Sequence, residues 1–345
     1  MLPLESSNGN NAWGIILSEI STLRAAEGFT GYYYGVVDPT YGSGVAGIGY
    51  VPGRAAVGWD NLPSGDGVAA HELGHNLSLF HAPCGGVSGA DPSFPYAGGK
   101  IGVHGFDVAA NALKLPSSND LMGYCGSNWI SDYHYIKALL HRQASPMMSY
   151  VSAAPEPVLL VWGRVVRGEV ILEPAFELDA PALLPRGRGA FQLEALDAAG
   201  RVRYTAAFNG ESVADAEGDE RHFTFAIPLG RMGGAAPAQL RVRGRDGSAL
   251  RQSAVALRAG DAVSGQAFQR MQEPAAPRAS RVASEAVGLA WDARSYPMAL
   301  VRDAATGQIL SFARGGDVRL VSGARDLDVT FSDGVRSRRE RVAVR

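Results

Sequence analysis

Three histidines and a glutamate lie within eleven residues of this chain, at His71, Glu72, His75 and His81. His71 and His75 are four positions apart, and on an α-helix such residues lie on one face, one turn apart. Their imidazoles can therefore face one ion. Glu72 lies about 100° around the helix, so it is better placed to hold a water at that ion than to ligate it. This is the H-E-x-x-H arrangement, in which the glutamate is a general base beside zinc.

A histidine pair with this spacing also occurs by chance on the surface of amphipathic helices. Two further features favour a metal site. His81 supplies a third imidazole six residues after His75. The segment Asp120–Tyr124, which contains Met122, follows about 40 residues downstream. We therefore expect a zinc ion held by His71, His75 and His81.

The pattern resembles the metzincin metallopeptidases, whose extended motif is H-E-x-x-H-x-x-G-x-x-H followed by a methionine turn. The resemblance covers roughly residues 10–145. The matching positions are held by His71, Glu72, His75, His81 and Met122. The resemblance implies an α+β catalytic domain, α/β/α-like with a mixed sheet, and a zinc endopeptidase activity.

Ser78 departs from this pattern, because the family has glycine at its position. The glycine lets the helix stop sharply, so that the chain turns back and the third histidine reaches the metal. Positive φ at a residue other than glycine costs about 1 kcal/mol. Either Ser78 takes that conformation, or the turn is built in another way.

The resemblance also implies a mechanism. Glu72 would take a proton from the attacking water and pass it to the leaving amine. Met122-Gly123-Tyr124 is similar to the Met-x-Tyr of astacin-like and serralysin-like enzymes, in which the tyrosine hydroxyl approaches the zinc and stabilises the transition state. Tyr124 would have that catalytic role. The alternative is an ordinary core tyrosine beneath the metal site.

In metzincins the strand before the zinc helix lies at the sheet edge and pairs with an extended substrate. The candidate here is Arg54–Asp60, and its residues Ala55, Ala56, Val57 and Gly58 are the predicted substrate-binding positions. An ordinary hairpin is the alternative for this segment.

The two cysteines both flank the predicted site, because Cys84 follows His81 by three residues and Cys125 follows Tyr124 directly. A disulfide would tie the end of the zinc helix to the methionine turn and stabilise the fold by about 3–4 kcal/mol. Two free buried thiols, or Cys84 as a metal ligand, are the alternatives. A disulfide implies an oxidising compartment, and hence a secreted or cell-surface protein.

The chain of 345 residues is long enough for two or three domains. All three lysines and six of the seven histidines precede residue 150, which predicts a boundary near Ser145–Pro157. We expect a zinc peptidase domain over 1–150, an all-β immunoglobulin-like sandwich over 155–258 and a small β domain over 281–345, joined by a linker at Gly260–Ser280. The two β regions could instead form one larger assembly.

Residues 82–119 are rich in Gly, Pro, Ser and Asp and predict a long irregular segment beside the cleft. Asp91 and Asp107 within it could help to bind Ca²⁺, although no EF-hand loop is present. Trp129–His141 predicts a helix capped by Ser131, with Trp129 at its start as a candidate for the border of the substrate pocket.

The net charge of −2 does not suggest nucleic acid as a partner, and no apolar run is long enough to span a membrane. Met1–Glu5 lacks the features of a secretion signal, so we expect a mature form or a fragment. The expected partner is a protein or peptide substrate bound as an extended strand, including glycoproteins. The alternatives are a catalytically weak metzincin scaffold used for binding or adhesion, and a zinc amidase acting on cell-wall peptide.

Overall fold

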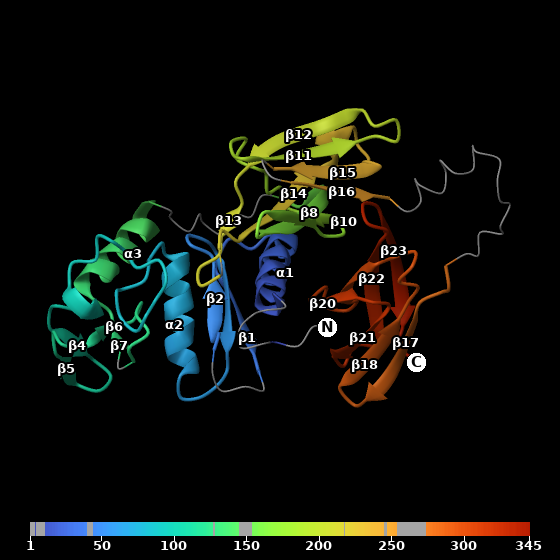
Figure 1. The fold of residues 1–345 in the computed structure, drawn as a ribbon. Helices are drawn as coiled ribbons and strands as arrows, with labels where there is room; N and C mark the ends of the chain where they lie inside the picture. Colours follow the sequence, from blue (N-terminus) through green and yellow to red (C-terminus); the bar gives the residue numbers. More distant parts are fainter. Residues whose placement is uncertain are drawn as a thin grey trace.

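The computed structural model describes Leu4 and residues 11–39, 44–126, 128–144, 154–216, 218–244, 247–253 and 274–345. A mixed α+β region comes first and is followed by several antiparallel β-sheets (Figure 1). Residues 145–153 and 254–273 lie outside the described part, and with them most of the predicted boundary near Ser145–Pro157 and of the predicted linker at Gly260–Ser280.

A small mixed sheet forms the centre of the N-terminal region. Its order is β1-β3-β2, with β1 (Tyr33–Val37) parallel and β2 (Gly47–Gly49) antiparallel to the central strand β3 (Ala55–Trp59). Helix α1 (Ala12–Glu27) packs on one face of this sheet and helix α2 (Gly65–Asn76) on the other (Figure 1).

Helix α1 is buried on more than one side because it lies between two sheets. Trp13 and Leu17 pack with Ile48 and Val57 of the small sheet. Towards its C-terminal end, Ala25 and Ala26 join a core that contains Trp162 of the C-terminal half. Short side chains at these positions let the helix approach both sheets closely. The helix ends at Gly28, whose φ of 66° suits a left-handed C-cap.

The segment after α2 is more ordered than the predicted irregular loop. It contains a 3-10 turn, η1 (Ala97–Gly99), and a short hairpin, followed by a parallel strand pair and helix α3 (Asp132–Ala144). The hairpin strands are β4 (Gly105–Asp107) and β5 (Ala112–Lys114), and the pair is β6 (Asn119–Asp120) with β7 (Asn128–Trp129). The predicted capping of α3 is confirmed, because the His134 amide donates to Ser131 Oγ at 3.2 Å.

Two antiparallel sheets face each other across a shared core in the first part of the C-terminal half. One sheet contains β8 (Glu156–Val166), β9 (Glu169–Leu172), β10 (Phe176–Ala180), β13 (Glu211–Ser212) and β14 (Arg221–Pro228). The other contains β11 (Phe191–Leu196), β12 (Val202–Phe208), β15 (Gln239–Arg243) and β16 (Ser248–Gln252), with the 3-10 turn η2 (Leu229–Met232) between β14 and β15.

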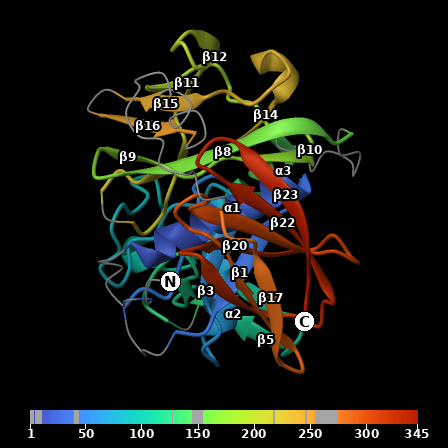
Figure 2. The ribbon, with the colours of Figure 1, turned by 90° about the vertical axis from the view of Figure 1, so that its right-hand side faces the viewer.

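A second pair of antiparallel sheets follows and has its own core around Trp291 and Phe331. Its strands are β17 (Arg278–Ala283), β18 (Ala286–Ala290) and β21 (Asp317–Val321) in one sheet, and β19 (Met298–Asp303), β20 (Ile309–Arg314), β22 (Asp326–Ser332) and β23 (Ser337–Ala343) in the other. Figure 2 shows this pair against α1 and the sheet of β8. Met298 and Phe312 join the core of Trp162, and Arg314 forms a hydrogen-bonded ion pair with Glu19 of α1.

Candidate metal centre

The end of helix α2 decides whether His81 can reach the other two histidines. Ser78 has a φ of 68°, so the serine adopts the left-handed conformation that the glycine of the family pattern would provide. The Ser78 amide donates to the His75 carbonyl at 2.8 Å, and the Leu79 amide donates to the Gly74 carbonyl at 3.1 Å. These two bonds make a Schellman motif, which satisfies the last carbonyls of the helix and reverses the chain.

Each of the three imidazoles is oriented by a backbone carbonyl. The Nδ1–H groups of His71, His75 and His81 donate to the carbonyls of Leu121 at 2.9 Å, Leu79 at 2.9 Å and Ser88 at 2.6 Å, in that order. Because a carbonyl can only accept, each Nδ1 carries the proton and each Nε2 is left with a lone pair. This is how metal-ligating histidines are commonly held.

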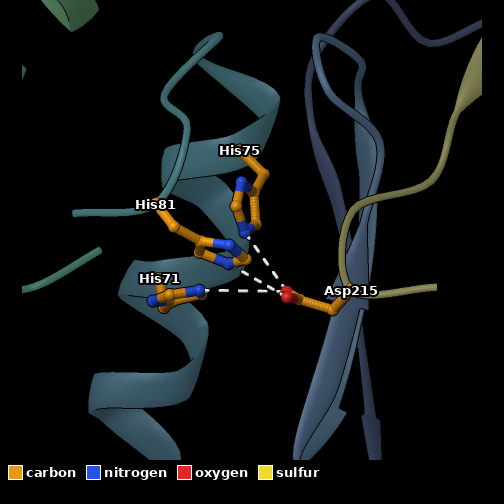
Figure 3. Close-up of side chains that lie close together, drawn as sticks. All are labelled: His71, His75, His81 and Asp215. Carbon is orange, nitrogen blue, oxygen red and sulfur yellow. Dashed lines mark ion pairs between the residues drawn. The ribbon is translucent and has the colours of Figure 1, made fainter. Parts of the chain in front are cut away.

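The three Nε2 atoms converge on the carboxylate of Asp215, which comes from the connection between β13 and β14 (Figure 3). The Asp215 oxygens lie 3.9 Å from His71 Nε2, 3.2 Å from His75 Nε2 and 2.9 Å from His81 Nε2. All four ligand atoms fall within 4.8 Å of one another. Ligands around a tetrahedral zinc are separated by about 3.3 Å, so the group could hold such an ion.

The chemistry of this donor set calls for a cation. Three imidazole lone pairs and one carboxylate are all hydrogen-bond acceptors, and within the described residues none of the three buried Nε2 atoms has a hydrogen-bond partner. Acceptors facing one another inside a protein repel unless a positive charge lies between them. The residues therefore fit a divalent metal ion.

The charges at the site shift the pKa values of its members. Burial, followed by the neighbouring His75, lowers the pKa of His71 to about 4. Burial also opposes protonation of His81, but the nearby Asp215 carboxylate outweighs it and raises the pKa of His81. The pKa of Asp215 itself is lowered, because the contacts with His75 and His81 outweigh burial.

Glu72 lies beside the metal ligands and is 3 % exposed. Its Oε2 has no hydrogen-bond partner within the described part of the chain. Burial, and then the charge of Asp215, raise the pKa of Glu72 well above its ordinary value. Gly47 and Gly49 of β2 make room for it, since a Cβ on Gly47 would stand 2.8 Å from Glu72 Oε1. The carboxyl group of Glu72 thus lies between α2 and β2.

The predicted methionine turn lies beneath helix α2. Met122 is fully buried, and a Cβ on Gly74 would stand 2.5 Å from its Sδ. Asp120 fixes the turn, because its Oδ1 accepts from the Met122 amide and its Oδ2 from the Ser131 amide, at 2.8 and 2.9 Å. Leu121 lies between Asp120 and Met122 in the chain, so its carbonyl is held where it accepts a hydrogen bond from His71.

Tyr124 stands at the mouth of the site and is 51 % exposed, so it is not a core residue. Its ring centroid lies 5.7 Å from that of His71 and 5.2 Å from that of His81. Its hydroxyl donates to the Asp215 carboxylate. The catalytic role of Tyr124 stays a prediction.

Cys84 and Cys125 form the predicted disulfide, with their Cα atoms 5.7 Å apart. Cys84 is therefore not a metal ligand. The bond joins the segment after His81 to the segment after Tyr124, and the Tyr124 amide donates to the Cys84 carbonyl at 3.0 Å. The disulfide is consistent with an extracellular location. None of the described helices is long and apolar enough to cross a membrane.

A pocket of about 940 Å³ opens beside the histidines. One side of it is lined by residues 44–47, by the start of α2 with its preceding turn, and by His71 and Glu72. The other lining residues are Leu121, Gly123, Tyr124, Gly126 and Asp215. Trp129 is not part of this lining and lies instead beneath Lys114, whose ammonium is 4.9 Å from the ring centroid.

The prediction that Arg54–Asp60 forms an edge strand is wrong. Ala55, Ala56, Val57 and Gly58 belong to β3, which is hydrogen-bonded to β1 on one side and to β2 on the other. A substrate strand cannot add to it. The strand that borders the pocket is β2, which is antiparallel to β3. Hydrophobic patterning alone cannot order three short strands, because the order is set by their packing against α1 and α2.

Among the described residues, the predicted calcium ligands Asp91 and Asp107 belong to no group of candidate metal ligands. Asp91 accepts from Lys137 Nζ and from the Tyr133 hydroxyl, at 2.8 and 2.9 Å. Asp107 pairs with Lys114 Nζ at 3.2 Å. Each carboxylate is already neutralised by an ammonium group, so neither offers support for a calcium site.

Asp215 was not predicted from the sequence. It is a single aspartate more than a hundred residues after His81, in a region whose pattern indicates only β-structure. Asp120 and His134, which position the methionine turn, were also missed as a pair. No local spacing could have found any of these, because each contact depends on how distant segments pack.

Comparison with known proteins assigns this chain to no family. No protein-family model matches the chain, and no curated protein matches it. Among solved structures, one described as "Biofilm associated protein - BSP domain" is similar at 13% sequence identity with a TM-score of 0.15. That similarity covers 50% of this chain and 27% of the other, so this chain spans about a quarter of its length. We draw nothing about fold or function from it.

Proposed function

We propose that this protein is a zinc-dependent endopeptidase of the metzincin type that cleaves extracellular proteins, glycoproteins among them. The observation that carries the proposal is the convergence of three Nε2 lone pairs beside a buried glutamate. Each imidazole is locked by a carbonyl at Nδ1, and Oε2 of Glu72 has no hydrogen-bond partner within the described residues. Ligands and base come from the H-E-x-x-H helix and the turn that follows it.

His71, His75 and His81 would hold the ion. When bound, zinc polarises the substrate carbonyl and makes water at its open position easier to deprotonate. Glu72 would accept the proton of the attacking water and deliver it to the leaving amine. The Tyr124 hydroxyl, at the mouth of the site, would donate to the oxyanion. Residues 44–47 line the pocket and would guide an extended peptide.

The β regions are proposed to be accessory modules. Two facing antiparallel sheets with a shared core support an immunoglobulin-like sandwich over 155–258, of which residues 254–258 lie outside the described part. The second pair of sheets supports a small β domain over 281–345. The disulfide supports secretion or display at the cell surface.

Replacement of Glu72 tests the proposed chemistry. Glu72→Gln should retain one zinc per chain by elemental analysis and lose about 100- to 10,000-fold of its turnover of a quenched peptide library. The matched control is Glu285→Gln, on the exposed turn between β17 and β18, which should behave as the unaltered protein. A chelator should abolish turnover, and added zinc should restore it. Stoichiometric zinc with equal turnover in Glu72→Gln would rule out the general-base role.

A metal-binding protein without turnover is the second candidate. The observation that favours it is the Asp215 carboxylate, which occupies the side of the histidines where a substrate would approach. Bound zinc with no hydrolysis of any library peptide, in the unaltered protein and in variants at Asp215, would support this candidate.

A further inference from the structure

A segment of the first β-sandwich lies along the small sheet of β1, β2 and β3. The Val51 amide donates to the Ser212 carbonyl at 3.0 Å, and the Ala214 amide donates to the Gly49 carbonyl at 2.8 Å. Tyr50 and Val213 form an antiparallel bridge between these bonds. Residues Ser212 to Ala214 therefore form a short added strand beside the C-terminal end of β2, and the chain continues from it to Asp215.

This added strand is firmly anchored. Val213 is buried in the core of α1 and the small sheet, beside Trp13 and Tyr50. The base of the same hairpin is held by a buried polar chain, in which the Tyr50 hydroxyl and Nδ1 of His222 are 2.8 Å apart. Nε2 of His222 is in turn 2.7 Å from Glu220. The hairpin is part of the packing between the two regions.

At the tip of the hairpin between β13 and β14, the side chain of Asp215 lies against the candidate metal ligands. Asp215 has a φ of 61°, and this left-handed conformation turns its carboxylate toward His75 and His81 (Figure 3). The side chain is 11 % exposed and accepts a hydrogen bond from the Tyr124 hydroxyl. The contacts are thus shared by α2, the turn after it and the methionine turn.

We propose that residues 211–216 are a built-in cap that keeps the site latent. This proposal rests on the proposed function, since it names how that same site is regulated. Ser212 to Ala214 occupy the place of a substrate backbone on β2, and Asp215 is the fourth protein ligand of the ion. A zinc site with four protein ligands is closed, whereas catalytic sites keep one position open.

The cap and a substrate exclude each other. An extended peptide that crosses the ion would need the β2 edge that Ser212 and Ala214 already use. The pocket beside residues 44–47 stays open, so a substrate can dock on that side before it displaces Asp215. Activation is therefore the withdrawal of the hairpin tip from the histidines.

Cobalt-substituted protein tests the cap without relying on activity alone. We compare the unaltered chain with Asp215→Asn and Asp215→Ala, and use Asp219→Asn as the matched control. Asp219 lies on the same hairpin and pairs with Arg221 at the surface. Both Asp215 variants should change the visible absorption of Co²⁺, release the metal to a competing chelator about 10- to 100-fold faster, and hydrolyse a quenched peptide library at least about tenfold faster. Asp219→Asn should do none of these.

A second variant addresses the strand and leaves the carboxylate in place. Ala214→Pro removes the amide that donates to Gly49, so it should weaken the pairing with β2 and also raise turnover. Thermal melting of every variant shows that it is folded.

The outcomes separate the two proposals. A changed cobalt spectrum in the Asp215 variants without hydrolysis in any form supports Asp215 as a ligand and overturns the peptidase. Hydrolysis at the same rate in the unaltered chain and in all variants, with an unchanged spectrum, overturns the cap and leaves the peptidase standing.

Discussion

Oδ1 of Asp120 accepts a hydrogen bond from Nδ1 of His134 at 2.8 Å, and both side chains are fully buried. The same aspartate accepts from the Met122 and Ser131 amides. One carboxylate thus joins helix α3 to the methionine turn, and through the Leu121 carbonyl it sets the orientation of His71. The orientation of His71 thus depends on Asp120, which is not itself a member of the candidate ligand group.

We expect Asp120→Asn to destabilise the protein by about 3 kcal/mol, because an amide would present a donor to one of the donors that the carboxylate now satisfies. Urea unfolding followed by fluorescence measures the loss. The exposed Asp60→Asn is the matched control and should change the free energy of unfolding by less than about 0.5 kcal/mol. Equal midpoints for the two variants would contradict the supporting role.

The contribution of Asp120 should depend on pH. Burial opposes its ionisation, but the hydrogen bonds from His134, Ser131 and Met122 outweigh it and hold the pKa of Asp120 below its ordinary value. A carboxyl group with a lowered pKa in the folded state stabilises the protein above its unfolded pKa of about 3.9. That stabilisation is lost as the pH falls through the folded pKa.

The difference in unfolding free energy between the unaltered protein and Asp120→Asn should accordingly be constant above about pH 5 and shrink below about pH 4. Urea titrations at intervals of pH measure it. A difference that grows on acidification would have the wrong sign for this explanation.

Ser78→Gly should stabilise the protein by about 0.5–1 kcal/mol, because glycine reaches the left-handed conformation of this residue without the Cβ penalty. Ser78→Ala keeps that penalty and is the control. Differential scanning calorimetry should show a higher Tm for the glycine variant only. A gain in the alanine variant of the same size would mean that the serine hydroxyl, and not the backbone, causes the strain.

Removal of the disulfide by Cys84→Ser together with Cys125→Ser should lower the free energy of unfolding by about 3–4 kcal/mol, since the bond closes a loop of 41 residues in sequence. We expect the zinc content to persist, because neither sulfur is among the grouped ligands. Loss of stoichiometric zinc in a variant that still melts cooperatively would show that the disulfide also shapes the metal centre.

The parts of this site that depend on short-range geometry could be predicted from the sequence. Helical periodicity places His71 and His75 on one face, and the offset of His81 suits a chain that reverses at Ser78. The flanking positions of Cys84 and Cys125 predicted their disulfide. The histidine pair and the turn at Ser78 depend on local backbone conformation. The disulfide could be predicted because both cysteines follow residues of the same site.

The strand that borders the cleft and the residue that faces the histidines depend on how distant segments pack, so neither could be predicted from the sequence. The order β1-β3-β2 follows from the packing of three short strands between α1 and α2, and their alternation is the same in any order. Asp215 reaches the three histidines because a hairpin of a distant sheet pairs with the chain at the end of β2. Such a contact depends on how two separately patterned regions pack together, and no spacing along the chain encodes it.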